Sequence, residues 1–158
     1  MSEAERWFER KHFVEDTSLV LEESGIPRMA GRILGWLLIC DPPYQSIDDL
    51  AGMLQASKGS ISTMTRYLIQ LGLVERIGIP GKRRDYYRTR DDSWISLFRQ
   101  QLTMMSSLRQ LMDRGLALLS AEGSAATERV REVHDLCAYF EKEIPALLDR
   151  WERERKPA

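Results

Sequence analysis

The sequence predicts a mainly helical chain with one small β-hairpin. Six segments carry apolar residues at helical spacing, and most of them are closed by glycine, proline or a loop-forming cluster. A single stretch, from residue 73 to 90, is instead rich in β-branched and aromatic residues around a Pro-Gly pair. The 158 residues are 30% charged and 43% hydrophobic, which is typical of a folded protein and not of a disordered chain.

The first two helices are expected over residues 3–23 and 27–40. In the first, Trp7, Val14 and Leu21 recur every seven residues and therefore lie on one face. The centre of the second, ILGWLLIC, is apolar nearly all round, so this helix should be buried. Two consecutive prolines in DPPY then end it, because proline cannot continue a helix.

Two helices with a tight turn between them follow, over residues 47–55 and 57–71. Ser46 and Ser57 are the expected N-cap residues, and Asp49 can complete a capping box with Ser46. The second of these helices has an apolar face and an opposite face of glycine, serine, threonine, arginine and glutamine. This polar face is either ordinary solvent surface or a surface that approaches a partner closely.

The hairpin that comes next has three adjacent cations at its tip. In IPGKRRDYY, Pro80 and Gly81 favour a tight turn, and the cations of residues 82–84 follow it directly. Residues 58–90 carry eight cations and two anions, a net charge of +6, whereas the whole chain stands at −1. Neighbouring cations repel one another, so they are solvated or face an anion. A basic block within an acidic chain indicates a nucleic-acid site.

Two long helices complete the chain, over residues 91–121 and 125–154. Apolar residues of the last helix alternate in steps of three and four, the a/d pattern of a helix that packs along a partner. This seam consists of Val130, Val133, Cys137, Phe140, Ile144, Leu147 and Trp151. Pro145 is expected to kink or restart the helix. The seam can pack on the preceding helix or on a second copy, and we favour a homodimer because the face of Trp7, Val14 and Leu21 also needs a partner.

The order of these elements is that of a helix-turn-helix followed by a wing. The second short helix is narrow enough to enter the major groove, where Lys58 or Arg66 can reach a guanine edge or a phosphate. Arg83 and Arg84 of the wing can lie along the backbone or enter the minor groove. The expected domains are an N-terminal dimerisation helix (1–25), a winged helix-turn-helix DNA-binding domain (26–92) and a C-terminal helical dimerisation region (93–158).

Three stretches resemble the MarR-type winged-helix regulators, and more closely their GbsR-like branch: GIPRMAGRILGWLLICDPP, SIDDLAGMLQASKGSISTMTRYLIQLGLVERI and PGKRRDYYRTR. The resemblance implies a homodimeric transcription factor that binds double-stranded DNA. Residues that match the family's recognition helix are Ser57, Lys58, Ser60, Ser62, Thr63 and Arg66, and those that match its wing are Lys82, Arg83 and Arg84. The common wing of this family has an acid two residues before its arginine, whereas Gly81 and Lys82 precede Arg83 here. The resemblance therefore leaves open how this wing is held in shape.

The resemblance also implies an effector cleft near the junction of the DNA-binding and dimer parts. Candidates to line it are Trp36, Trp94, Phe98 and Met105. Aromatic and methionine stripes are more often plain core, and nothing in these residues identifies an effector. The GbsR-like resemblance suggests that the effector is a quaternary ammonium such as choline, which aromatic faces bind.

No cofactor, metal or catalytic activity is expected. The two histidines, His12 and His134, lack ligands at metal-binding spacing, and the chain has no nucleophile elbow, phosphate loop or HExxH pair. Cys40 and Cys137 are far apart with no evident cationic neighbour, so redox sensing is disfavoured. No apolar run approaches the ~20 residues of a membrane span, and the acidic N-terminus does not resemble a signal peptide, so a cytoplasmic protein is expected.

The predicted function is a sequence-specific transcriptional regulator that binds a pseudo-palindromic operator as a homodimer. The alternative is a winged helix used as a protein-interaction or structural module, which would not need the +6 segment. An enzyme is the third class, and the missing catalytic motifs argue against it.

Overall fold

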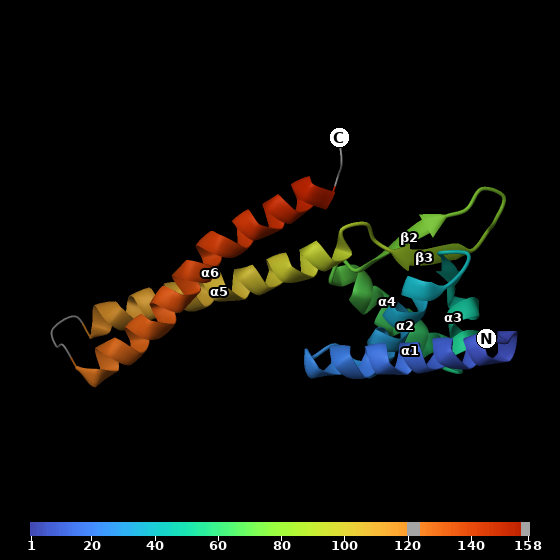
Figure 1. The fold of residues 1–158 in the computed structure, drawn as a ribbon, viewed down its shortest axis with the longest axis horizontal. Helices are drawn as coiled ribbons and strands as arrows, with labels where there is room; N and C mark the ends of the chain where they lie inside the picture. Colours follow the sequence, from blue (N-terminus) through green and yellow to red (C-terminus); the bar gives the residue numbers. More distant parts are fainter. Residues whose placement is uncertain (120–123, 156–158) are drawn as a thin grey trace. The chain divides into compact units, whose positions relative to one another are not determined.

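The structure, a computed structural model, describes residues 1–119 and 124–155 and forms two compact units, Met1–Ser96 and Leu97–Ala158 (Figure 1). The described residues form α1 (Glu3–Glu23), α2 (Arg28–Ile39), β1 (Gln45–Ser46), α3 (Ile47–Leu54), α4 (Lys58–Gln70), β2 (Val74–Gly78), β3 (Asp85–Thr89), α5 (Ser93–Leu118) and α6 (Ala125–Arg155). The predicted class, mainly helical with a small hairpin, is confirmed. Residues 120 and 121, predicted at the end of the fifth helix, lie outside the described residues.

Helices α1 and α2 pack so closely that a Cβ atom has no room at Gly31 and little room at Gly35. A Cβ atom on Gly31 would lie 2.8 Å from the Cα of Ser18, and one on Gly35 would lie 3.1 Å from the Cβ of Thr17. The buried face of α1 meets α2 here, with Ser18 fully buried at the contact. The first helix is therefore part of the first compact unit and not a separate extension.

The core of the first unit lies around α2. Helix α2 is buried on most sides, as its apolar centre predicts, and it packs against α1, α3 and α4. The side chains that are fully or almost fully enclosed here include Ile33, Leu34, Leu50, Ile61, Leu68, Leu73 and Val74. This core fixes the position of α4 relative to the two helices before it.

Local hydrogen bonds set where α3 and α4 begin. The Ser46 hydroxyl oxygen accepts from the Asp49 N–H at 3.1 Å, and the Asp49 carboxylate accepts from the Ser46 N–H at 2.9 Å. The predicted capping box is therefore formed. Between the two helices Gln55 takes a left-handed conformation with φ of 51°, which reverses the chain before α4.

The sheet has three antiparallel strands in the order β1-β3-β2. The predicted hairpin supplies β2 and β3, with Arg76 opposite Tyr87 in the register. The two-residue strand β1 pairs Gln45 with Tyr87 on the other edge of β3 and was not predicted, because so short a segment has no periodicity.

In the second unit α5 and α6 form a helical hairpin (Figure 1). The Val130 side chain of α6 would be 3.3 Å from a Cβ on Gly115 of α5, so the two helices are in direct contact there. Helix α6 continues through Pro145 as one element, whereas the sequence predicted a kink or a restart. The proline removes one backbone hydrogen bond, and the remaining turns carry the helix past it.

Candidate nucleic-acid interface

The outward side of α4 carries the side chains predicted to meet DNA. Ile61, Thr65 and Leu68 are buried and fix the opposite side of the helix against the core. Ser57 accepts a hydrogen bond from the Ser60 N–H at 3.2 Å, so its oxygen caps the helix. Of the predicted residues, Ser57, Lys58, Thr63 and Arg66 are exposed, and Ser60 and Ser62 are half-buried.

The wing, residues 79–84 between β2 and β3, carries its three cations on an exposed turn. The Lys82 N–H donates to the Ile79 carbonyl at 3.0 Å, and Gly81 has φ of +78°. This is the tight turn that the Pro-Gly pair predicts. The cations of residues 82–84 follow the turn and are all exposed.

The cations of the two hairpin strands are already neutralised within the hairpin. Arg88 Nε lies 2.7 Å from Glu75 Oε1, and these two residues are direct partners in the strand register. Arg76 Nη1 lies 3.3 Å from Asp85 Oδ2. Cross-strand pairs of opposite charge stabilise a hairpin modestly. The strands therefore contribute little free charge, and the wing turn contributes most of it.

Asp48, in the first turn of α3, contacts two of the cations predicted to bind DNA. Its Oδ1 lies 2.6 Å from Lys58 Nζ of α4, and its Oδ2 lies 3.2 Å from Arg84 Nη1 of the wing. The hydrogen bond and the charge of Lys58 lower the pKa of the Asp48 carboxyl, and Arg84 adds to this effect. We call this contact the Asp48 bridge.

The remaining cations of the basic segment face solvent. In the part of the chain that the structure describes, Arg66, Lys82, Arg83 and Arg90 have no carboxylate within ion-pair distance and are exposed. Arg66 belongs to α4, and Lys82 and Arg83 belong to the wing. The free positive charge of the segment thus includes the two elements predicted to meet DNA.

Arg32 of α2 connects the helix-turn-helix to α1. Its Nε donates to Glu15 Oε1 of α1 at 2.7 Å, and its Nη2 donates to the Leu54 carbonyl at 3.1 Å. The Leu54 carbonyl is at the C-terminal end of α3, where backbone acceptors lack partners within the helix. One guanidinium therefore joins three helices.

A cavity of about 320 Å³ lies beside this contact. Its walls include Phe8, Trp36 and Leu54, with Lys11 and Arg32 as cationic groups. Of the four residues predicted to line an effector cleft, Trp36 lines this cavity and Trp94 does not, while Phe98 and Met105 belong to the second unit. The indole N–H of Trp36 donates to Gln45 Oε1 at 3.1 Å, which fixes the ring.

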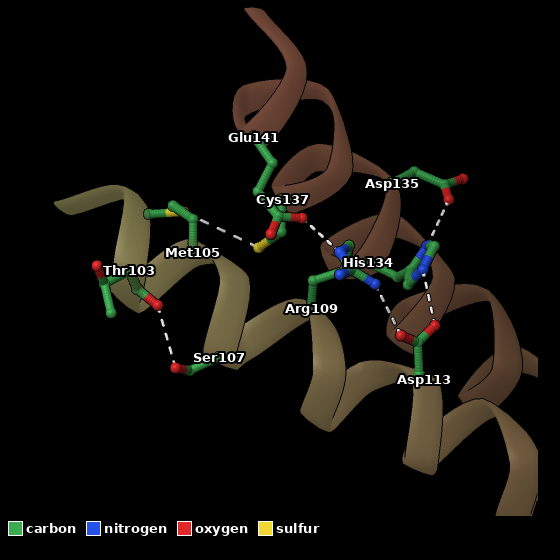
Figure 2. A network of polar contacts seen from close by, with 9 residues as sticks. All are labelled: Thr103, Met105, Ser107, Arg109, Asp113, His134, Asp135, Cys137 and Glu141. Atoms are coloured by element: carbon green, nitrogen blue, oxygen red, sulfur yellow. Dashed lines mark hydrogen bonds and ion pairs between the residues drawn. The ribbon is translucent and has the colours of Figure 1, made fainter. Parts of the chain in front are cut away.

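Polar contacts join α5 to α6 in the second unit (Figure 2). Arg109 forms an ion pair with Glu141 and another, at 2.9 Å, with Asp113. His134 Nε2 lies 3.0 Å from Asp113 Oδ1, and the Cys137 thiol lies 3.9 Å from the Met105 sulfur. A hydrogen bond from Ser106 and the neighbouring Arg109 lower the pKa of the Glu141 carboxyl.

The residues predicted at a dimer interface divide into two groups. Val14 and Leu21 are buried in the core of their own unit at 3% and 9% exposure, so they cannot also contact a partner. Cys137 is likewise buried in the α5–α6 hairpin. Seam residues with at least a third of their surface exposed are Val133, Phe140, Leu147 and Trp151; Val130 and Ile144 are half-buried, and Trp7 packs edge-on against Trp36.

The outer side of α1 presents apolar side chains that the sequence reasoning did not single out. Phe8 is 60% exposed and Val20 is 65% exposed, and Phe13 and Leu19 are exposed as well. The seven-residue spacing of Trp7, Val14 and Leu21 marked the core face of this helix, and the exposed apolar residues lie outside that face among charged neighbours.

Residues 1–119 and 124–155 give little support to a metal site, a reactive thiol or a membrane span. No group of three histidine, cysteine, aspartate or glutamate side chains there could hold a metal ion. Burial raises the pKa of the Cys40 thiol, which disfavours the reactive thiolate. In the same ranges, no helix has the length and apolar character required to cross a membrane.

Comparison with known proteins decides the family. The chain is 42% identical over 139 residues to the HTH-type transcriptional regulator MmpR5 of Mycobacterium tuberculosis, with 88% of this chain and 84% of that protein covered. The chain belongs to the MarR family of transcriptional regulators. Residues 92–154 match the model of the MmpR5-like MarR family transcriptional regulators. This MarR-family protein also resembles a crystal structure of a transcriptional regulator with a TM-score of 0.76 and 40% identity, covering 92% of this chain and 99% of that chain.

Family membership makes the protein a winged helix-turn-helix, DNA-binding regulator of transcription, as the sequence predicted. These two relatives are regulators of transcription and not enzymes. Sequence reasoning missed the Asp48 bridge and interpreted Asp48 only as an acid at a helix N-terminus. The missing acid two residues before Arg83 did not indicate this contact, because Asp48 pairs with Arg84 and not with Arg83.

Proposed function

We propose that this MarR-family regulator binds a pseudo-palindromic DNA operator as a homodimer, with α4 in the major groove and the wing on the backbone or in the minor groove. The observation that carries the proposal is the distribution of free charge. The strand cations Arg76 and Arg88 have carboxylate partners, whereas Arg66 of α4 and Arg83 of the wing have none in the described residues. Cations without an internal partner are available to phosphates.

The outward face of α4 suits close approach to base edges. Serine and threonine side chains are short, and Arg66 has the planar fork that pairs with guanine. The wing presents cations on a short turn that cannot fill the major groove as a helix does, so we expect its main contacts to be with phosphates. We therefore assign sequence readout to α4 and backbone contacts to the wing.

A homodimer is supported by apolar surface that the chain leaves exposed. Phe8 and Val20 of α1, and Leu147 and Trp151 of α6, are each at least 40% exposed. Exposed apolar side chains on α1 and on α6 are available to a protein interface, and a two-fold operator requires two copies of α4. The centres of the two half-sites of the operator are expected to lie one helical turn apart, which is ~10 bp.

Regulation by a small molecule is a second proposal, and the cavity beside Trp36 supports it. Two cations, Lys11 and Arg32, line this cavity with the single carboxylate of Glu15, which Arg32 already neutralises. The cavity thus suits a neutral or anionic apolar molecule better than a quaternary ammonium. The relationship to the GbsR-like branch stays a prediction that rests on the three sequence stretches.

Selection of bound fragments from random duplex DNA tests the proposed function. A two-fold symmetric motif is expected, and Arg66→Ala should cost ~1–3 kcal/mol on that motif and relax preference at one position of each half-site. Arg83→Ala should weaken all sequences alike and reduce the slope of log K against log salt by about 0.9. No enrichment of any sequence would favour the protein-interaction module instead.

A further inference from the structure

Three elements of the helix-turn-helix meet at one carboxylate. Asp48 belongs to α3, Lys58 opens α4, and Arg84 ends the wing turn. The two carboxylate oxygens are divided between them, with Oδ1 at 2.6 Å from Lys58 Nζ and Oδ2 at 3.2 Å from Arg84 Nη1. Both cations are among those proposed to contact DNA.

The fold does not require this contact. The carboxylate that closes the capping box of α3 is Asp49, so the helix begins correctly without Asp48. The Asp48 side chain is 41% exposed, and those of Lys58 and Arg84 are 71% and 65% exposed. Ion pairs this exposed contribute little to stability. The Asp48 bridge therefore needs an explanation other than stability.

The wing offers Arg84 no other carboxylate in the described part of the chain. The nearest acid in sequence, Asp85, pairs with Arg76 across the hairpin, and Glu75 pairs with Arg88. Asp48 thus supplies from α3 the anionic support that the wing itself lacks.

We propose that Asp48 is the internal counterion of Lys58 and Arg84, which holds the wing beside the start of α4 and suppresses sequence-independent binding to DNA. This inference rests on the proposed function. A phosphate that approaches Lys58 or Arg84 must share the cation with Asp48 or displace Asp48. Each phosphate contact therefore contributes less to the free energy of binding. On the correct operator, the Asp48 bridge has already fixed the relative positions of the two cations. This preorganisation lowers the entropy cost of binding and offsets part of the reduced binding free energy.

The experiment compares wild type with Asp48→Asn, which keeps the size of the side chain and removes its charge. On a scrambled duplex we expect the affinity to rise several-fold. The slope of log K against log salt should steepen by about 0.9 for each cation released, which is a change of about 1.8 if both are released. On the operator the gain should be smaller, so the ratio of specific to non-specific affinity falls.

Glu75→Gln is the matched control, because it removes a carboxylate paired with an arginine in the same domain and changes the net charge equally. It should change the salt slope less than Asp48→Asn, because it releases only Arg88, which is not among the cations proposed to contact DNA. A second test adds Asp48→Asn to a Lys58→Gln/Arg84→Gln background, where its effect should fall to that of Glu75→Gln. Equal effects of Asp48→Asn and Glu75→Gln, or an undiminished effect in that background, would overturn the proposal.

A measurement without DNA separates this proposal from the proposed function. The titration of the Asp48 carboxyl, followed by NMR in the full chain, should move to higher pH in Lys58→Gln/Arg84→Gln than in wild type. An unchanged titration contradicts the Asp48 bridge whatever the protein does with DNA. Absence of duplex binding by wild type, together with a shifted titration, would instead defeat the proposed function and leave the bridge standing.

Discussion

The two compact units differ in how they are held together. Among the described residues, sixteen of the seventeen buried apolar side chains belong to the first unit, and the second unit has Cys137 alone. The first unit thus has a core of its own, whereas the second is a pair of helices joined by polar contacts and flanked by exposed apolar residues. The difference indicates that the apolar core of the chain lies in the first unit, and that the second unit leaves apolar side chains available to the proposed homodimer.

Polar contacts cannot replace the missing core of the second unit. The Arg109 pairs with Glu141 and Asp113 are partly exposed, and pairs of this kind contribute little to stability. Apolar side chains such as Leu136 and Tyr139 are 55% and 61% exposed. Burial of this surface by a second copy would supply the stabilisation that the hairpin lacks.

The largest effect is expected when charge is placed on the exposed surface of the second unit. Phe140→Asp combined with Leu147→Asp removes two apolar side chains worth ~1.5–3 kcal/mol each when fully buried, so the dissociation constant of the dimer should rise at least ~100-fold. Sedimentation at several concentrations measures this. Lys142→Asp, an exposed change on the same helix, is the control and should leave the dimer intact. A wild-type chain that sediments as a monomer at tens of micromolar would contradict the claim that a second copy covers the exposed apolar surface of the second unit.

A smaller but still large effect is expected in the core of the first unit. In Gly31→Ala the new Cβ meets the Ser18 backbone at 2.8 Å, so α1 and α2 must separate. Overpacking typically costs ~1–3 kcal/mol, which exceeds the gain of up to ~1 kcal/mol from replacing glycine within a helix. Gly52→Ala in α3 meets nothing within 4 Å and should show that gain alone. The free energies of unfolding from denaturant titration should therefore change in opposite directions.

A moderate gain is expected where the first core contains an unsatisfied polar atom. Thr65 is 1% exposed, and its hydroxyl has no hydrogen-bond partner among the residues that the structure describes. Thr65→Val keeps the branched shape and removes the buried hydroxyl, so the free energy of unfolding should rise by ~1 kcal/mol. Thr63→Val, on the exposed side of the same helix, should change it little. A loss of stability in Thr65→Val would mean that the hydroxyl is bonded in solution.

The smallest effect concerns pH and the second unit. The pKa of Glu141 is lowered from its ordinary value of 4.5, so the folded state binds a proton less readily than the unfolded state. The contribution of Glu141 to stability is thus present above that value and is lost as the pH falls through the lowered pKa. Glu141→Gln should melt slightly below wild type at neutral pH and no lower than wild type in acid. A constant difference across this range would show that the charge of Glu141 is not involved.

Local rules were enough to predict most of the first unit. Ser46 and Ser57 cap their helices as expected, because capping depends only on residues within one turn. The burial of Val14 could not be assigned to a partner or to the chain itself, because a periodic apolar face does not name what covers it. The Asp48 bridge depends on the return of the wing to α3, which no local pattern encodes. The continuation of α6 through Pro145 likewise depends on how many turns lie on each side of the proline.

The position of Arg32 has a consequence for how a signal would travel through the first unit. Its guanidinium holds Glu15 of α1 and the carbonyl of Leu54, and the next residue, Gln55, is the left-handed corner from which the chain turns into α4. A displacement of α1 that exceeds the range of these hydrogen bonds would therefore break one of the contacts or move the corner with it. Besides the packing of α2 against both α1 and α4, this side chain gives the N-terminal helix a polar connection to the start of the helix proposed to read DNA.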